Sequence, residues 1–158
     1  MNIRRKILDA ITPAPGCILT TGCFDLITRG HLELLNAAAD LYKPCELYVS
    51  MLYVGINDDE SVRKLKGPTR PINNEEDRMF HLAALQMVDR VFLIRSINVA
   101  NAIRKLKPTI WVKGGDYTME TLNQEEVAAA KEVGARIVLF PKFGAYSSTS
   151  VIEKLQQP

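Results

Sequence analysis

The chain has 158 residues, of which 47% are apolar and 24% are charged, and its formal net charge is +2. This length suits one domain with a substantial core, so we expect a single domain over residues 1–158, in which residues 1–15 form a helix and a proline-rich turn. The small net charge gives no indication of a nucleic-acid partner, and no apolar run is long enough to span a membrane.

The cysteines, at positions 17, 23 and 45, show no paired metal-ligand spacing. No signal peptide is recognisable at the N-terminus. We therefore expect reduced thiols, no protein-held metal and a cytoplasmic location.

Apolar periodicity predicts alternating strands and helices along the chain. Cys17–Thr21 reads as a buried strand, and the spacing of Leu34, Leu35 and Ala38 predicts a helix over 30–41. Asn57–Asn74 is polar and contains Gly and Pro, which predicts a loop. The other expected elements are helices at 3–11, 75–87, 99–106, 123–133 and 147–155, and strands at 46–56, 90–94, 109–113 and 136–140. This order predicts a single-domain α/β fold, a Rossmann-like parallel sheet with helices on both faces.

Ligands of such sheets bind beyond the carboxyl ends of the strands. Four segments rich in polar residues or glycine follow predicted strands there: Gly22–His31, Asn57–Arg70, Gly114–Tyr117 and Lys142–Thr149. Each could be an ordinary turn, a solvated loop or a helix cap if it stood alone. Because all four converge on one edge of the sheet, we interpret them together as a ligand site.

The first of these segments places backbone N–H groups, a hydroxyl and an imidazole at the start of a helix, which suits phosphate. Gly22 allows close backbone approach, and Thr28 and His31 are spaced to face one phosphate. The second segment offers Lys64 and Lys66 as cations. In the fourth, hydroxyl side chains precede a helix, where free N–H groups also bind anions.

At these residues the chain resembles the nucleotidyltransferase superfamily marked by (H/T)-x-G-H. Within it, the chain is most similar to the heptose 1-phosphate adenylyltransferases. The matching segments are Gly22–Asp25, Asp59–Gly67, Arg70-Pro71, Asp77-Arg78, Val88–Val91, Val112–Tyr117 and Ser147–Ile152. Val112–Tyr117 discriminates best, because glycerol-phosphate cytidylyltransferases differ there. Thr28 stands where these two families have His, although phosphopantetheine adenylyltransferases have Thr at this position.

The resemblance implies that AMP is transferred from ATP to a sugar 1-phosphate, releasing pyrophosphate, in the synthesis of a lipopolysaccharide precursor. It implies catalytic roles for His31, Thr28, Lys64, Lys66 and Arg78. It implies nucleotide binding by Thr21, Gly22, Cys23, Phe24, Asp25, Gly30, Gly115, Asp116, Tyr146, Ser147, Ser148 and Thr149. Mg²⁺ would be carried by the nucleotide, and we expect a homo-oligomer with no nucleic-acid or membrane partner.

Two alternatives remain at this point. One is a cytidylyltransferase that acts on glycerol 3-phosphate or another small phosphorylated acceptor, although Gly144-Ala145-Tyr146 replaces the E-G-I of those enzymes. The other is a nucleotide-binding protein without turnover, of which Thr28 would be the trace.

Overall fold

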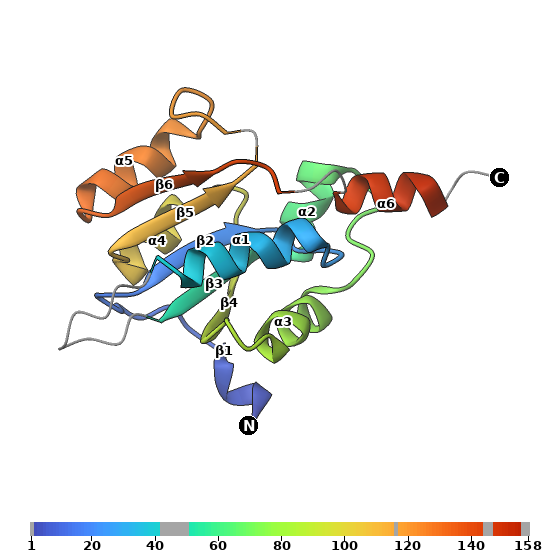
Figure 1. Cartoon of the computed structure of the whole chain (residues 1–158), viewed down its shortest axis with the longest axis horizontal. Coiled ribbons are helices and arrows are strands. Elements are labelled where there is room, and N and C mark those ends of the chain that lie inside the picture. The colour runs from blue at the N-terminus through green and yellow to red at the C-terminus, as the bar shows by residue number, and fades with distance from the viewer. Residues whose placement is uncertain (1, 42–50, 116, 144–146, 156–158) are drawn as a thin grey trace.

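The computed structural model describes residues 2–41, 51–115, 117–143 and 147–155 (Figure 1). Its centre is a six-stranded sheet in the order β1-β4-β3-β2-β5-β6, in which every neighbouring pair is parallel. The strands are β1 (Ile7–Leu8), β2 (Ile18–Gly22), β3 (Leu52–Asn57), β4 (Arg90–Ile94), β5 (Ile110–Gly114) and β6 (Arg136–Phe140). The helices are α1 (Arg29–Ala39), α2 (Asp59–Lys66), α3 (Glu75–Ala84), α4 (Ala100–Leu106), α5 (Gln124–Glu132) and α6 (Ser148–Leu155).

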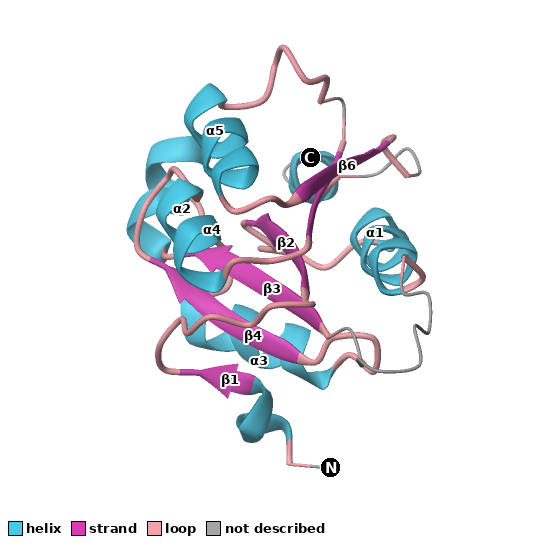
Figure 2. Ribbon diagram, turned by 90° about the vertical axis from the view of Figure 1, so that its left-hand side faces the viewer, coloured by secondary structure: helices cyan, strands magenta, loops and turns pink. Residues whose placement is uncertain are grey.

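Helices pack on both faces of this sheet (Figure 2). Leu19 of β2 and Trp111 of β5 face a cluster that α4 and α5 cover. Ile18 of β2 and Val112 of β5 point to the opposite face, where α1 and α3 pack. Adjacent residues of one strand thus enter different cores, as strand geometry requires. The predicted fold class is confirmed.

The chain changes direction within the sheet beside β2. From β2 it runs through β3 to the next strand outward, β4, and then returns to form β5 on the other side of β2. Gly22 is in register with Ile56 of β3, and Gly114 with Phe140 of β6, so the carboxyl ends share one edge. A crevice opens at such a switch point, and parallel sheets bind their ligands there.

The predicted helix at 3–11 is wrong beyond its first turn. Ile3–Lys6 forms a short 3-10 helix, and Ile7–Leu8 then pairs with β4 as an edge strand. The buried Lys6 ammonium donates to the carbonyls of Leu85 (2.9 Å) and Val88 (2.6 Å). Strand pairing satisfies backbone groups that β4 would otherwise expose, and this outweighs the local helical pattern.

The predicted loop at 57–74 contains a helix, α2. Asp58 caps it by accepting the Ser61 N–H (2.9 Å), and Gly67, at φ 99°, follows its last residue. Only Ser61 and Val62 of this helix are buried, and Val62 and Leu65 are its only apolar residues, so the apolar pattern is too short to indicate a helix. Acidic residues in its first turn and basic residues in its last turn suit the helix dipole, and this was the available signal.

The other predicted elements in the described ranges are confirmed, with ends that shift by a few residues. Asn74 caps α3 by accepting the Asp77 N–H, as predicted. The strand predicted at 46–56 is present from Leu52, and residues 46–50 lie outside the described ranges. Within those ranges, no helix has the length and apolarity to cross a membrane.

The hydrogen bonds of the buried Lys6 ammonium predict that this residue stabilises the fold. Lys6→Met keeps the apolar stem but leaves the carbonyls of Leu85 and Val88 without their charged donor. We expect the free energy of unfolding to fall by about 1.5–3 kcal/mol, the range for hydrogen bonds to charged groups, as measured by urea denaturation. The control Arg5→Met removes an exposed charge from the same turn, and an equal loss in that variant would contradict the assignment.

Candidate active site

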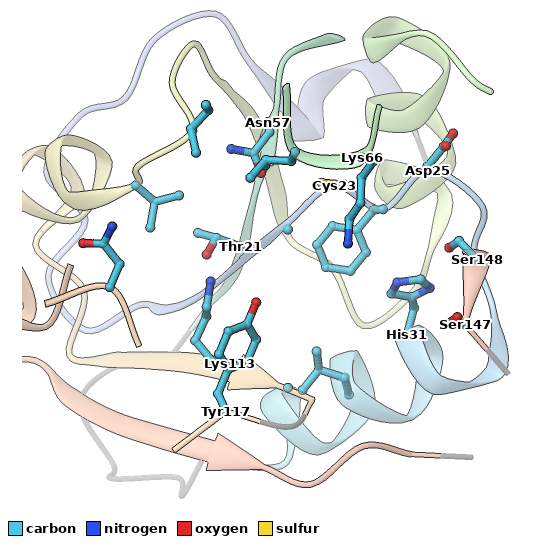
Figure 3. A pocket seen from close by; sticks show the side chains of 18 of the residues that line it. Thr21, Cys23, Asp25, His31, Asn57, Lys66, Lys113, Tyr117, Ser147 and Ser148 are labelled. Carbon is cyan, nitrogen blue, oxygen red and sulfur yellow. The ribbon is translucent and has the colours of Figure 1, made fainter. Parts of the chain in front are cut away.

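A cavity of about 650 Å³ opens at the carboxyl edge of the sheet, a volume within the range of small-molecule sites. It brings together residues from the β2–α1 loop, the end of α2 and the start of α6, which are far apart in the sequence (Figure 3). The predicted site residues that line it are Thr21, Gly22, Cys23, Phe24, Asp25, His31, Lys66, Ser147, Ser148 and Thr149.

Five further predicted residues lie elsewhere than the cavity wall: Thr28, Gly30, Lys64, Arg78 and Gly115. The last two predicted residues, Asp116 and Tyr146, are outside the described ranges. The contacts of Thr28, Gly30 and Arg78 show that they support the lining residues.

Thr28 fixes the imidazole of His31. Thr28 precedes the first residue of α1, and its backbone N–H donates to Nδ1 of His31 over 3.1 Å. The Thr28 hydroxyl oxygen also lies 3.1 Å from this nitrogen. A nitrogen that accepts a backbone N–H carries no proton, so the neutral ring holds its proton on Nε2. Thr28 is therefore a positioning residue for His31.

The charge state of His31 follows from its surroundings. Burial lowers the pKa of His31, and its ring lies 5.2 Å from that of Phe24 between centroids. Because the ordinary pKa of histidine is already below 7, the ring is neutral at neutral pH. His31 thus lines the cavity as an uncharged hydrogen-bond donor through Nε2, a group that suits a phosphate oxygen.

Residue 30 must be glycine because another backbone segment approaches it closely. A Cβ atom at Gly30 would lie 2.6 Å from the carbonyl oxygen of Phe143, in the segment that precedes α6. The Ser148 hydroxyl donates to the carbonyl of Leu26 over 2.8 Å, which ties α6 to the β2–α1 loop. The starts of α1 and α6 therefore meet at one end of the cavity.

The first turn of α6 is closed by two serines. The Ser147 N–H donates to the Ser150 hydroxyl (2.8 Å), and the Ser150 N–H donates to the Ser147 hydroxyl (3.1 Å). N–H groups in a first helical turn have no intrahelical acceptor, and the helix dipole favours an anion there. In Figure 3, His31, Ser147 and Ser148 lie together at this end, which we call the α6 end.

The Asp25 carboxylate forms its hydrogen bonds with groups of the protein itself. It accepts the Arg70 Nε–H at 2.6 Å and the backbone N–H groups of Ile72 (2.8 Å) and Asn73 (3.0 Å). Burial raises the pKa of Asp25, but these hydrogen bonds and the Arg70 charge outweigh it, and the net pKa lies below the ordinary value. Asp25 therefore anchors the loop that carries the site.

Arg78 also forms its hydrogen bonds with groups of the protein itself, and its catalytic role stays a prediction. Its side chain is fully buried. It donates to the carbonyls of Cys23 (2.6 Å), Asn57 (2.9 Å) and Asn73 (3.1 Å) and to the carboxylate of Asp59 (2.8 Å). These partners fix the ends of β2 and β3, so Arg78 supports the cavity from beneath.

The two lysines of α2 differ in direction. Lys64 pairs with Glu60 (2.5 Å) on the exposed face and is not among the lining residues, so its catalytic role stays a prediction. Lys66, the last residue of α2, lines the cavity. A spacing of two residues puts these side chains on different sides of a helix.

Sequence reasoning gave no site role to several lining residues, which include Lys113, Asn123 and Glu126. Asn57 and Tyr117 also line the cavity, and both lie in segments that the sequence predicts as parts of the ligand site. Lys113 belongs to the discriminating Val112–Tyr117 segment, which was a usable signal. Glu126 carried no signal, because α5 faces the cavity only through the topology.

A family model described as Cytidylyltransferase-like matches residues 19–154. The chain belongs to this family of nucleotidyltransferases.

Among curated proteins, the chain is 40% identical over 156 residues to the "Bifunctional protein HldE" of Trichlorobacter lovleyi, which covers 96% of the chain and 30% of that protein. It is 41% identical over 137 residues to the protein of the same name from Mesorhizobium japonicum, covering 87% of the chain and 26% of the relative. The chain thus spans less than a third of the length of these relatives.

A solved structure shares the fold. It is the lipopolysaccharide core biosynthesis protein from Thermoplasma volcanium, with a TM-score of 0.63 and 22% identity, covering 82% of this chain and 98% of that one.

The depressed pKa of Asp25 predicts how the stability of the protein depends on pH. Because its folded pKa is depressed, its stabilisation is fully present above the ordinary aspartate pKa of about 3.9 and is lost as pH falls through the lower folded value. We expect Asp25→Asn to be less stable than wild type at pH 7, by urea denaturation, with a difference that shrinks towards pH 2. The control Asp9→Asn changes an exposed carboxylate. A difference for Asp25→Asn that stays constant with pH would contradict this account.

Proposed function

We propose that the protein transfers AMP from ATP to the phosphate of a sugar 1-phosphate, with heptose 1-phosphate as acceptor, and releases pyrophosphate. Family membership supports nucleotidyl transfer, and similarity to the HldE relatives, with the Val112–Tyr117 segment, supports this acceptor. The observation that carries the proposal is the α6 end, where a neutral imidazole donor meets the positive end of a helix in one cavity. We further propose that the product feeds lipopolysaccharide synthesis in the cytoplasm, where ATP and sugar phosphates are found.

The proposed reaction is a direct displacement at the α-phosphorus of ATP. An oxygen of the acceptor phosphate forms the new bond, the bond between the α-phosphorus and the bridging oxygen breaks, and pyrophosphate leaves with that electron pair. The attacking phosphate is already an anion, so no general base is required. Positioning and charge stabilisation then account for catalysis.

The residues of the α6 end suit the triphosphate. The His31 Nε2–H would donate to a phosphate oxygen, and the N–H groups of Ser148 and Thr149 in the first turn of α6 would bind the departing pyrophosphate. Lys66 would neutralise charge on the same group. Burial raises the pKa of the Cys23 thiol, partly offset by Lys66, Arg78 and Arg70, which argues against a thiolate nucleophile.

Mg²⁺ fits this site as part of the nucleotide. Among the described residues, no three His, Cys, Asp or Glu side chains gather as metal ligands. We therefore propose that Mg²⁺ arrives bound to phosphate oxygens, where it would neutralise charge, and we assign it no protein ligand. A homo-oligomeric state also stays a prediction.

The test is pyrophosphate release with ATP or CTP across heptose 1-phosphate, a second sugar 1-phosphate and glycerol 3-phosphate. We expect the highest kcat/KM for ATP with heptose 1-phosphate. Preference for CTP with glycerol 3-phosphate would replace the proposal with the cytidylyltransferase alternative. Absence of release with every pair, together with measurable nucleotide binding, would favour a protein without turnover.

His31 gives a sharper prediction for the active protein. His31→Ala removes the Nε2 donor, and we expect kcat to fall by about 10²–10³-fold, as when one transition-state donor is lost. The matched control is His81→Ala, an exposed histidine on α3, which we expect to keep wild-type kcat. Unchanged turnover in His31→Ala would remove this residue from the mechanism.

A further inference from the structure

The end of the cavity opposite α6 contains a largely buried cation that the mechanism above does not use. The Lys113 side chain is 14% exposed and lines the cavity. Its ammonium lies 5.5 Å from the ring centre of Trp111 and 5.3 Å from that of Tyr117. Its carboxylate neighbour is Glu126, with 3.9 Å between Nζ and Oε2. Burying an ammonium whose counter-ion is this distant costs free energy, unless a bound ligand supplies a closer anion.

Glu126 fixes the position of this cation. The Glu126 side chain is 8% exposed, and its Oε1 accepts the backbone N–H of Val99 over 3.0 Å. That bond orients the carboxylate so that Oε2 faces Lys113. Burial lowers the pKa of Lys113, and the Glu126 carboxylate partly offsets this shift. The Glu126 carboxylate therefore favours the protonated form of Lys113 at the wall of the cavity.

Thr21 supplies a second, independent observation. Its hydroxyl oxygen is buried, and it has no hydrogen-bond partner among the described residues. In Figure 3 the Thr21 and Lys113 side chains point towards each other from neighbouring strands. Buried hydroxyls are normally hydrogen-bonded, so the cavity wall at Thr21 and Lys113 is a position for an oxygen-rich ligand.

The geometry of nucleotidyl transfer indicates which substrate group binds at Lys113 and Thr21. Displacement at phosphorus is roughly in line, so the attacking oxygen and the leaving pyrophosphate lie on opposite sides of the α-phosphorus. The α6 end suits the pyrophosphate, which leaves the Lys113 end for the attacking group. We propose that Lys113 and Thr21 bind the phosphate of the acceptor, and that Glu126 is the positioning residue for Lys113. This inference rests on the proposed function.

Steady-state kinetics test the assignment with the acceptor that supports turnover in the wild type. Lys113→Met removes the charge at similar size, and we expect the acceptor KM to rise about 10–100-fold, the equivalent of one charged hydrogen bond. We expect the KM for ATP to change by less than about threefold, on the same argument. Thr21→Val should also raise the acceptor KM, by about 3–10-fold. The control is Lys131→Met, an exposed lysine on α5.

The pH dependence separates a charge role from a packing role. Acceptor binding needs protonated Lys113, and because its pKa is lowered, kcat/KM for the acceptor should fall on the alkaline side below the ordinary lysine pKa of about 10.4. Lys113→Arg cannot deprotonate in this range, so this limb should disappear. Glu126→Gln should move the limb to lower pH, because the ammonium loses its counter-ion.

The outcomes distinguish this inference from the proposed function. An active wild type whose Lys113→Met variant raises the KM for ATP, and not that for the acceptor, would place Lys113 in the nucleotide subsite and overturn the inference. An alkaline limb that Lys113→Arg retains would overturn it as well. A wild type without turnover on any nucleotide–acceptor pair would instead refute the proposed function.

Discussion

The cavity depends on one buried guanidinium. Arg78 is fully buried and joins the carbonyls at the ends of β2 and β3 to the carboxylate of Asp59 at the start of α2. Peptide oxygens at strand ends have no ladder partner, so a multidentate cation satisfies several of them together. Removing a partner of Arg78 would leave a buried charge without compensation, which is strongly destabilising. These hydrogen bonds join the start of the β2–α1 loop to the end of β3.

The cations near the cavity fall into two groups according to their partners. Arg78 and Arg70 are bound to Asp59 and Asp25 and support the loops. Lys66 and Lys113 line the cavity without so close a carboxylate partner among the described residues, one near each region where the proposed reaction would require phosphate. Structural cations hold their carboxylates at 2.6–2.8 Å, whereas Lys113 stands 3.9 Å from Glu126. The distances therefore distinguish Lys113 from the two supporting arginines.

The sequence predicted the alternating parallel sheet because apolar periodicity and Gly or Pro breaks are local signals. It also predicted the β2–α1 loop and the α6 start as lining, since both follow strands at one edge. It failed at α2, whose apolar pattern is too short to indicate a helix, and at Ile7–Leu8, where an edge strand replaced a helix. It could not distinguish Lys64 from Lys66 or recognise that Arg78 and Asp25 are satisfied internally, because those outcomes depend on tertiary contacts.

The central claim is that the cavity positions two substrates for one direct displacement, with no enzyme nucleophile. The stereochemical course at the α-phosphorus tests this most directly, using ATP made chiral there with sulfur and the acceptor that the wild type accepts. The account predicts inversion of configuration in the nucleotidyl product. Retention would reveal two successive displacements through a covalent enzyme intermediate, and it would contradict the account.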